Sequence, residues 1–215
     1  MAVRLPRGLR ADEKGVVRCA WPGDHEDYIA YHDEEWGRPQ ADTTRLFEKI
    51  CLEGFQAGLS WLTILRKRDA FRRAFRNFDI ETVARFNKRS VERLLSDPGI
   101  VRHRGKIEAA IVNARCALRL IEEFGSLSSF VWHFEPTPES RPKRIDHKAL
   151  LELTESDESR AMSRALRERG WRFVGPTTLY AFMQSVGIVN DHTEGCFCRK
   201  AVDQERRDFT PPVYR

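Results

Sequence analysis

Two pairs of potential metal ligands lie near opposite ends of the 215-residue chain. Cys19 and His32 form the first pair, and His192 and Cys196 form the second. Thiolate sulfur and imidazole nitrogen are common ligands of tetrahedral Zn²⁺, so the four residues could bind one zinc ion that joins the two ends of the chain. The spacing alone fits free thiols and a buried histidine equally well, and Cys198 could replace Cys196 as a ligand.

Four large aromatic side chains are interleaved with the first pair of potential ligands. They lie in the segment CAWPGDHEDYIAYHDEEW and are Trp21, Tyr28, Tyr31 and Trp36. A metal ion that fixed this irregular segment would also fix the aromatic faces that the segment carries. A rigid aromatic wall is suited to a planar ligand, so this segment predicts a site for one.

A carboxylate, Glu53, follows the aromatic segment in the chain. The apolar residues after Asp42 recur at helical spacing, and Asp42 itself can cap the start of that helix. Gly54 and Gly58 then predict that the helix ends at Glu53, in a flexible loop that leads to Trp61. A carboxylate at such a helix end is usually solvated, but here it is close in sequence to an aromatic side chain.

Composition places the chain among globular proteins of a reducing compartment. Its 41% hydrophobic content is enough for a substantial core in a chain of this length. The five cysteines are an odd number, and Cys51 and Cys116 lie in apolar helical patterns, which argues against a disulfide framework. We find no signal-peptide core and no run of about eighteen apolar residues, so we expect a cytoplasmic protein that is not inserted in a membrane.

Basic residues outnumber acidic residues by 37 to 32, which gives a net charge of +5 and a sequence pI near 9.1. Much of the positive charge is concentrated in four runs, at residues 66–76, 102–106, 141–144 and 164–172. Each run alone is typical of a solvated helix face. The four runs together favour a nucleic-acid partner.

Periodicity in the rest of the chain predicts helices and no strands, so we expect an all-α fold. The longest predicted helix runs from about His103 to Phe124. A helical pattern from Ser156 to Arg169 leads into a glycine-bounded hairpin, GWRFVGP, and then into a helix from Thr177 to Val186. A helix, hairpin and helix in this order can bind a phosphate through backbone N–H groups, although similar pairs also occur in proteins that bind nothing.

Six motifs together resemble one known family. They are CAW, YIAYHDEEWG, CLEGFQAGLSW, GIVRHRGKI, RFVG and VNDHTEGC, in this order over about residues 18–198. The chain is similar in these motifs to the 3-methyladenine DNA glycosylase I family. The resemblance implies a helix-hairpin-helix glycosylase fold with a structural Zn²⁺ that joins segments 18–36 and 188–198. It also implies a monofunctional enzyme that removes 3-methyladenine from alkylated double-stranded DNA.

The resemblance further implies roles for individual residues. The zinc ligands that it implies are Cys19, His32, His192 and Cys196. Cys198 is then not a ligand. The resemblance also makes Glu53 the catalytic carboxylate in a pocket that holds the alkylated base. The aromatic residues of this pocket are Tyr31, Trp61, Trp21 and Tyr28.

DNA contacts are expected from two further parts of the chain. We predict that the hairpin from Gly170 to Gly175 binds a phosphate through its backbone N–H groups. Arg102, Arg104 and Lys106 would add positive charge near the duplex, although these three residues also fit an ordinary exposed turn.

One departure from the wider helix-hairpin-helix superfamily affects the expected mechanism. Its glycosylases generally carry an Asp after the hairpin helix, where this chain has Asn190. In a regular backbone the adjacent Asp191 would point elsewhere, so we expect it to contribute little. Glu53 then remains the main carboxylate, and the cationic methylated base is expected to leave without a general acid.

We expect three parts along the chain. Residues 1–17 form a disordered leader, residues 18–200 form a single glycosylase domain, and residues 201–215 form a tail. The protein is expected to act as a monomer in the cytoplasm, associated with the nucleoid through DNA. The alternative function is a zinc-stabilised DNA-binding module without chemistry. Glu53 argues against this alternative, because a carboxylate buried among aromatic rings would repel DNA and cost desolvation energy.

Overall fold

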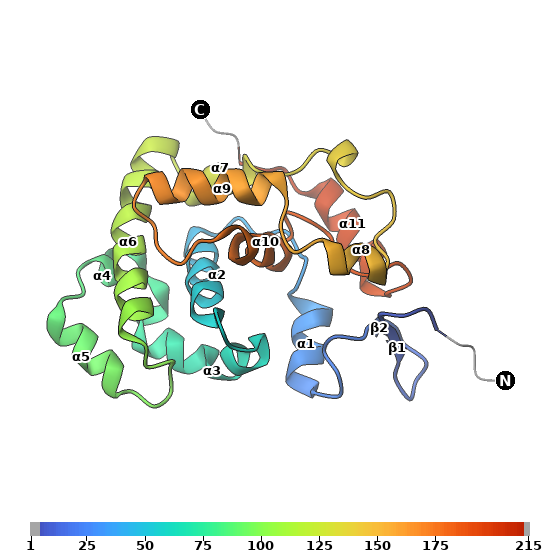
Figure 1. Cartoon of the computed structure of the whole chain (residues 1–215), viewed down its shortest axis with the longest axis horizontal. Coiled ribbons are helices and arrows are strands. Elements are labelled where there is room, and N and C mark those ends of the chain that lie inside the picture. Colours follow the sequence, from blue (N-terminus) through green and yellow to red (C-terminus); the bar gives the residue numbers. More distant parts are fainter. Residues whose placement is uncertain (1–4, 213–215) are drawn as a thin grey trace.

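The computed structural model describes residues 5–212, which form a mostly helical protein (Figure 1). In chain order the elements are β1 (Leu9–Ala11), β2 (Val17–Cys19), α1 (Glu26–Glu34), α2 (Thr43–Gln56), α3 (Trp61–Ala74), η1 (Arg76–Phe78), α4 (Ile80–Ala84), α5 (Lys88–Ser96), α6 (Arg104–Phe124), α7 (Leu127–Trp132), η2 (Pro138–Ser140), α8 (His147–Glu152), α9 (Asp157–Glu168), α10 (Pro176–Ser185) and α11 (Cys198–Asp208). The predicted all-α class is confirmed, except that β1 and β2 form one small β-hairpin. Within residues 5–212, no helix is both long and apolar enough to cross a membrane.

Helix α2 is the buried centre of the fold. Its first turn is capped by Asp42, whose carboxylate accepts a hydrogen bond from Arg45 N at 2.8 Å, as the sequence predicted. Residues 46–55 are all buried, and the helix packs against α3, α6, α7 and α10 (Figure 1). Because protein surrounds this helix, its charged residues Lys49 and Glu53 lie in the interior.

The prediction that α2 ends at Glu53 is wrong, because Gly54 serves close packing rather than helix termination. The helix continues through Gly54 to Gln56. A Cβ at Gly54 would lie 3.3 Å from the Cβ of Phe173 and 3.4 Å from its carbonyl oxygen. Phe173 belongs to the hairpin between α9 and α10, so the glycine lets this hairpin lie against α2. Glu53 is therefore held by the last turn of a buried helix.

The long helix α6 and the helix-hairpin-helix arrangement are as predicted. Helix α6 ends at Gly125, which has a left-handed conformation with φ of 76°. Asn113 of α6 fixes the hairpin through two hydrogen bonds with the backbone of Arg172. The amide nitrogen donates to the carbonyl at 2.9 Å, and the amide oxygen accepts from the backbone N–H at 2.8 Å. The hairpin thus has a defined position between α2 and α6.

The prediction of a disordered leader is wrong for the described residues. Strands β1 and β2 form an antiparallel hairpin, and Asp12 stabilises its turn by accepting a hydrogen bond from Val16 N at 2.9 Å. Phe197 N donates to Val17 O at 2.9 Å, which joins this hairpin to the C-terminal part of the chain. Each strand is too short for an alternating pattern to predict it. Residues 1–4 lie outside the described part.

The predicted domain end at residue 200 is also wrong, because α11 runs across it. Val202 of α11 is fully buried, and Arg206 forms an ion pair with Glu135 at 2.6 Å. These contacts make α11 part of the folded protein. The end of the predicted tail, residues 213–215, lies outside the described residues.

Candidate active site and metal centre

A cavity of about 260 Å³ lies among α1, α2, α3 and α10. It brings together all five pocket residues that the sequence predicted, which are Trp21, Tyr28, Tyr31, Glu53 and Trp61. The structure adds one aromatic and three polar residues to this wall, which are Trp36, Gln56, Gln184 and Asp191. A small cavity with mainly aromatic walls and a few polar groups is suited to one planar, partly polar ligand.

The aromatic rings of the cavity contact one another and form a continuous wall. The ring centroids of Trp21 and Tyr28 are 4.8 Å apart in an edge-to-face arrangement, and those of Trp21 and Trp36 are 5.1 Å apart. Tyr31 and Trp61, at 5.5 Å, continue the wall inwards. Such contacts restrict ring motion, so the ligand meets surfaces that are already oriented.

Glu53 is the buried carboxylate of this cavity, with only 5% of the residue exposed. Burial raises its pKa to about 8, although the nearby charge of Lys49 acts in the opposite direction. None of the residues between 5 and 212 donates a hydrogen bond to this carboxylate, and in the same part of the chain the buried indole N–H of Trp61 also has no partner. A carboxylate in this state gains most from a ligand that is cationic or that donates hydrogen bonds.

The prediction that Asp191 points away from the site is wrong, because this residue lines the cavity. Tyr180 Oη and Gln184 Nε2 each donate to one of its oxygens at 2.8 Å, and Arg141 forms an ion pair with the other. It is the preceding Asn190 that faces elsewhere, since its amide donates to Asp203 at 2.6 Å. The backbone here is irregular, so an argument from regular alternation does not apply.

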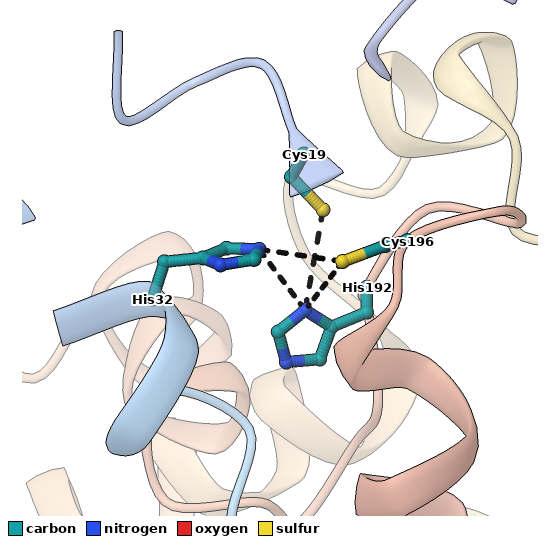
Figure 2. A group of neighbouring side chains, drawn as sticks. All are labelled: Cys19, His32, His192 and Cys196. Atoms are coloured by element: carbon teal, nitrogen blue, oxygen red, sulfur yellow. Dashed lines mark hydrogen bonds between the residues drawn. The ribbon is translucent and has the colours of Figure 1, made fainter. Parts of the chain in front are cut away.

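The four predicted metal ligands converge on one point (Figure 2), and all four residues are buried. His32 Nε2 lies 3.2 Å from His192 Nδ1, and Cys196 Sγ lies 3.6 Å from each of these nitrogens. Cys19 Sγ lies 4.0 Å from His192 Nδ1. Tetrahedral Zn²⁺ with ordinary Zn–N and Zn–S bonds places its ligand atoms about 3.3 to 3.8 Å apart. The two imidazole nitrogens and Cys196 Sγ are close to this spacing, and Cys19 Sγ lies slightly further out, so the four donor atoms fit a tetrahedral zinc site after a small shift of Cys19.

Cys198 lies beside this cluster rather than in it. It forms a separate group with His32 and Asp33, in which its Sγ is 3.8 Å from the carbonyl oxygen of Asp33. Residue spacing alone could not distinguish Cys196 from Cys198 as the fourth candidate ligand, because the two differ in the direction of the side chain.

Hydrogen bonds at the outer edge of the cluster orient both imidazoles. His32 Nδ1 is 2.7 Å from Asp33 Oδ1, and His192 Nε2 is 3.1 Å from the carbonyl oxygen of Trp36. Each outer nitrogen has an oxygen acceptor, which leaves the other nitrogen free to face the centre of the cluster. The Trp36 ring also stacks on His32 with a centroid distance of 6.2 Å, so the cluster supports part of the cavity wall.

The residues predicted to contact DNA have different surroundings. Arg102 is exposed, whereas Arg104 forms an ion pair with Glu92 at 2.8 Å. The prediction for Lys106 is wrong, because its Nζ donates to the carbonyl oxygens of Phe55 at 2.9 Å and Ala57 at 2.5 Å. A buried cation at the C-terminal end of a helix satisfies carbonyls that have no partner within the helix.

The hairpin residues lie as the sequence predicted. Gly170 has a left-handed conformation with φ of 89°, and Gly175 is the N-cap residue of α10, which begins with Pro176. The start of α10 therefore has no capping side chain, and its first N–H groups remain available to an anion.

Comparison with known proteins identifies the family. The sequence profile of the methyladenine glycosylases matches residues 21–199. A DNA-3-methyladenine glycosylase 1 from Escherichia coli is 48% identical over 184 residues, which cover 85% of this chain and 97% of the relative. A DNA-3-methyladenine glycosylase from Haemophilus influenzae is 42% identical and covers 86% of this chain and 98% of the relative.

Solved structures agree with this result. A crystal structure of a 3-methyladenine DNA glycosylase I is 48% identical, with a TM-score of 0.78 over 85% of this chain and 99% of that chain. The Staphylococcus aureus enzyme, solved to show how it recognises 3-methyladenine, is 35% identical with a TM-score of 0.78 over 85% of this chain and 96% of that chain. The profile, the identity and the shared fold together show that this chain belongs to the methyladenine glycosylase family.

Proposed function

We infer that the chain is a base-excision DNA repair enzyme that hydrolyses the N-glycosidic bond of 3-methyladenine in alkylated DNA. The observation that carries this inference is the Glu53 carboxylate, which is buried among aromatic rings without a hydrogen-bond donor from residues 5–212. The relatives from Escherichia coli and Haemophilus influenzae are named for the same activity.

The lesion itself supplies much of the chemical driving force. Methylation at N3 makes the adenine cationic, so the base becomes neutral when it takes the electron pair of the glycosidic bond. The pocket then needs to select and hold the base, and a general acid is not required. Aromatic faces such as that of Trp61 favour an electron-poor ring, and the charge of Glu53 favours a cation. Water completes the hydrolysis by adding to the sugar carbon and releases one proton to the solvent.

A base inside duplex DNA cannot reach this cavity, so it must be flipped out of the stack. Leu59 is exposed to 42% and follows Gly58, which has a left-handed φ of 80°, in the loop between α2 and α3. Its neighbours in sequence, Gln56 and Trp61, both line the cavity. We therefore propose that Leu59 enters the duplex and occupies the place that the flipped base leaves.

Substrate specificity tests the proposed function directly. We expect the protein to release 3-methyladenine from methylated duplex DNA and to leave hypoxanthine in place, because hypoxanthine is neutral and does not benefit from Glu53. Chromatography of the released bases measures both. Efficient release of hypoxanthine would contradict the proposed selection of a cation. No release of either base by a folded protein that binds DNA would favour a binding module without chemistry.

We also propose that Cys19, His32, His192 and Cys196 bind one structural Zn²⁺. The spacing of their donor atoms and the hydrogen bonds that orient both imidazoles support this proposal. Four protein ligands leave no open position for water, so the ion would stabilise the fold and take no direct part in bond cleavage. It would link β2 and α1 to the segment before α11.

The predicted contact between Arg102 and DNA can be tested by measuring DNA binding. Arg102 is exposed, and its proposed contact is with phosphate, which carries no sequence information. We therefore expect replacement of Arg102 by Glu to weaken binding to all duplex sequences alike and to reduce its dependence on salt. Titration of labelled duplexes at several salt concentrations measures both effects. Replacement of Lys106 by Met should instead lower stability, since this lysine is bonded to α2. Unchanged affinity of the Arg102→Glu variant at low salt would remove Arg102 from the interface.

Double-stranded alkylated DNA is the proposed partner, and we propose that the protein acts on it as a monomer. We propose that the protein works in the cytoplasm and is associated with the nucleoid through this DNA.

A further inference from the structure

Three exposed cations lie close together in the chain and have no role in the chemistry proposed above. Lys143 and Arg144 belong to the basic run at residues 141–144, and Lys148 follows in the first turn of α8. Within residues 5–212, none of these three side chains forms an ion pair with a carboxylate. Unpaired cations of this kind can neutralise phosphates, which releases the counter-ions that DNA holds.

The basic run at residues 66–76 is different, because acidic residues already pair with much of its charge. Arg66, Arg68 and Arg72 each form an ion pair with a carboxylate, at N–O distances of 2.6 to 2.8 Å. A cation paired in this way must leave its partner, or share it, before it can bind a phosphate. The unpaired charges at residues 143–148 therefore indicate a polyanionic partner more directly than the run at 66–76 does.

Two contacts attach the segment with these cations to the rest of the protein. We call residues 141–152 the α8 arm. Ile145 is only 3% exposed, and its carbonyl oxygen accepts a hydrogen bond from Glu194 N at 2.8 Å. Gly8 lies against His147, since a Cβ at Gly8 would be 3.0 Å from the Cβ of His147. These contacts give the α8 arm a defined place, although none of the residues of α8 is buried.

The α8 arm reaches the rim of the cavity at Leu150. This residue lines the cavity, whereas the adjacent Leu151 is exposed to 67%, more than any other large hydrophobic side chain in residues 5–212. Lys148 and Leu151 are three positions apart on α8, so they lie on one face of the helix. In Figure 1, α8 is on the other side of α2 and α10 from the hairpin that leads into α10. The cavity thus has an exposed, basic and apolar surface at its rim, apart from the hairpin.

The acidic residues of the α8 arm do not cancel its positive charge. The arm contains four basic and two acidic residues. One of the acidic residues, Asp146, is the cap of α8, and its carboxylate accepts a hydrogen bond from Ala149 N at 3.0 Å. This hydrogen bond, together with the charges of Arg144 and Lys148, lowers the pKa of Asp146. The carboxylate therefore faces the backbone of α8, and the exposed cations remain available to a partner.

We propose that the α8 arm is a second DNA-binding surface, which holds the strand of the flipped nucleotide at the rim of the cavity. This inference rests on the proposed function, because it needs a duplex whose base enters the cavity. Each DNA strand has a phosphate about every 3.4 Å along the helix axis, so such a duplex brings several phosphates to the rim. Lys143, Arg144 and Lys148 pair with these phosphates, and Leu151 packs against the apolar face of a deoxyribose.

The α8 arm and the hairpin then hold the DNA backbone at two separate places. Phosphate contacts fix the position of a protein on the duplex and carry no sequence information. Two such sets of contacts, one on each side of the flipped nucleotide, oppose the return of the base to the stack. The α8 arm therefore contributes to binding of duplex DNA and contributes nothing to binding of the free base.

Removal of two cations tests the proposal. Lys143→Gln combined with Arg144→Gln should weaken binding to damaged and undamaged duplexes alike. The slope of log affinity against log salt concentration should become shallower by about 2, since each phosphate contact contributes about 0.9 to it. Titration of fluorescent duplexes at several salt concentrations measures the slope. Affinity for free 3-methyladenine, measured by calorimetry, should not change, because Leu150 and the rest of the cavity lining are retained.

Lys88→Gln combined with Arg89→Gln is the matched control. It removes the same charge from two exposed positions of α5, a helix that contributes no residue to the cavity. The control should keep the slope of the unmodified protein. Equal slopes for the two double variants would overturn the proposal, because the effect would then belong to net charge and not to the α8 arm.

Leu151→Ser separates the apolar contact from the charged contacts. We expect the affinity for duplex DNA to fall roughly fivefold at every salt concentration, because partial burial of a leucine stabilises the complex by about this factor. The slope against salt should not change, since an apolar contact releases no counter-ions. Full affinity of this variant would overturn the proposed contact with deoxyribose.

Acetylation of lysines in the unmodified protein gives a test that needs no variant. Lys143 and Lys148 should react more slowly with an acetylating reagent when a duplex is bound, because a phosphate covers each ammonium group. Lys88 should react at the same rate with and without DNA, and mass spectrometry of peptides measures all three rates. Equal rates for Lys143 and Lys148 in the free protein and in the complex would overturn the proposal. These experiments measure binding, so their failure is distinct from failure of the proposed function, which is absence of 3-methyladenine release.

Discussion

The Glu53→Gln variant should lose 3-methyladenine release by a factor of about 10² to 10³, because a preorganised charge in a site without bulk water contributes this much to a reaction rate. The amide keeps the size of the side chain and its ability to accept a hydrogen bond, but it cannot ionise to the carboxylate that a cationic base in the cavity favours. Single-turnover release from methylated DNA measures the loss. Activity within a few-fold of the unmodified protein would contradict a catalytic role for Glu53.

The Glu53→Gln substitution should change stability in the opposite direction to activity. Burial raises the pKa of Glu53 from 4.5 to about 8, so the unfolded chain loses this proton at a lower pH than the folded protein does. Below about pH 4.5 both states are protonated and Glu53 has no net effect, whereas its cost to stability grows as pH rises to about 8. We therefore expect Glu53→Gln to be more stable than the unmodified protein at pH 8 and equally stable near pH 4. Urea unfolding at both pH values also shows that the inactive variant is folded.

Asp191 provides the comparison for Glu53, because it is the other carboxylate of the cavity. Both of its oxygens are already bonded, to Arg141 on one side and to Tyr180 and Gln184 on the other. Asp191→Asn should thus lower stability, since it leaves the half-buried Arg141 without its counter-charge, while it should cost less activity per folded molecule than Glu53→Gln. A folded, metal-loaded Asp191→Asn variant without activity would assign the catalytic role to Asp191.

The Cys196→Ser variant should lose both zinc and several kcal/mol of stability, because a structural ion contributes its binding free energy to folding. We expect about one zinc ion per chain in the unmodified protein and much less in the variant. Metal analysis and urea unfolding of the same samples measure the two losses. Binding of 3-methyladenine should weaken as well, since Trp36 lines the cavity and stacks on His32, one of the four proposed zinc ligands.

Cys198→Ser is the matched control for this experiment. It removes a second buried thiol two positions along the chain that lies outside the four-residue cluster. This variant should keep its zinc and most of its stability. Full zinc content in Cys196→Ser, or zinc loss in Cys198→Ser with retention in Cys196→Ser, would contradict the proposed ligand set.

The sequence by itself determined features that depend on residues close together in the chain. Caps such as Asp42 and the left-handed Gly125 define helix ends through contacts with the adjacent turn, and the structure confirms both. The apolar periodicity of α6 and the motifs around the cavity are similarly local. These features could be predicted because a helical turn involves only the nearest few residues.

Only the tertiary structure decided which charged groups are buried and what they contact. Lys106 is bonded to Phe55, which is 51 residues away, so its local sequence still resembled that of an exposed basic turn. The sequence predicted a helix end before Gly54, but the helix continues, and Phe173 from a distant part of the chain packs against this glycine. The direction of Asp191 likewise depends on an ion pair with Arg141, 50 residues earlier. Burial and side-chain direction result from contacts between distant segments, and a local pattern of residues carries no record of those contacts.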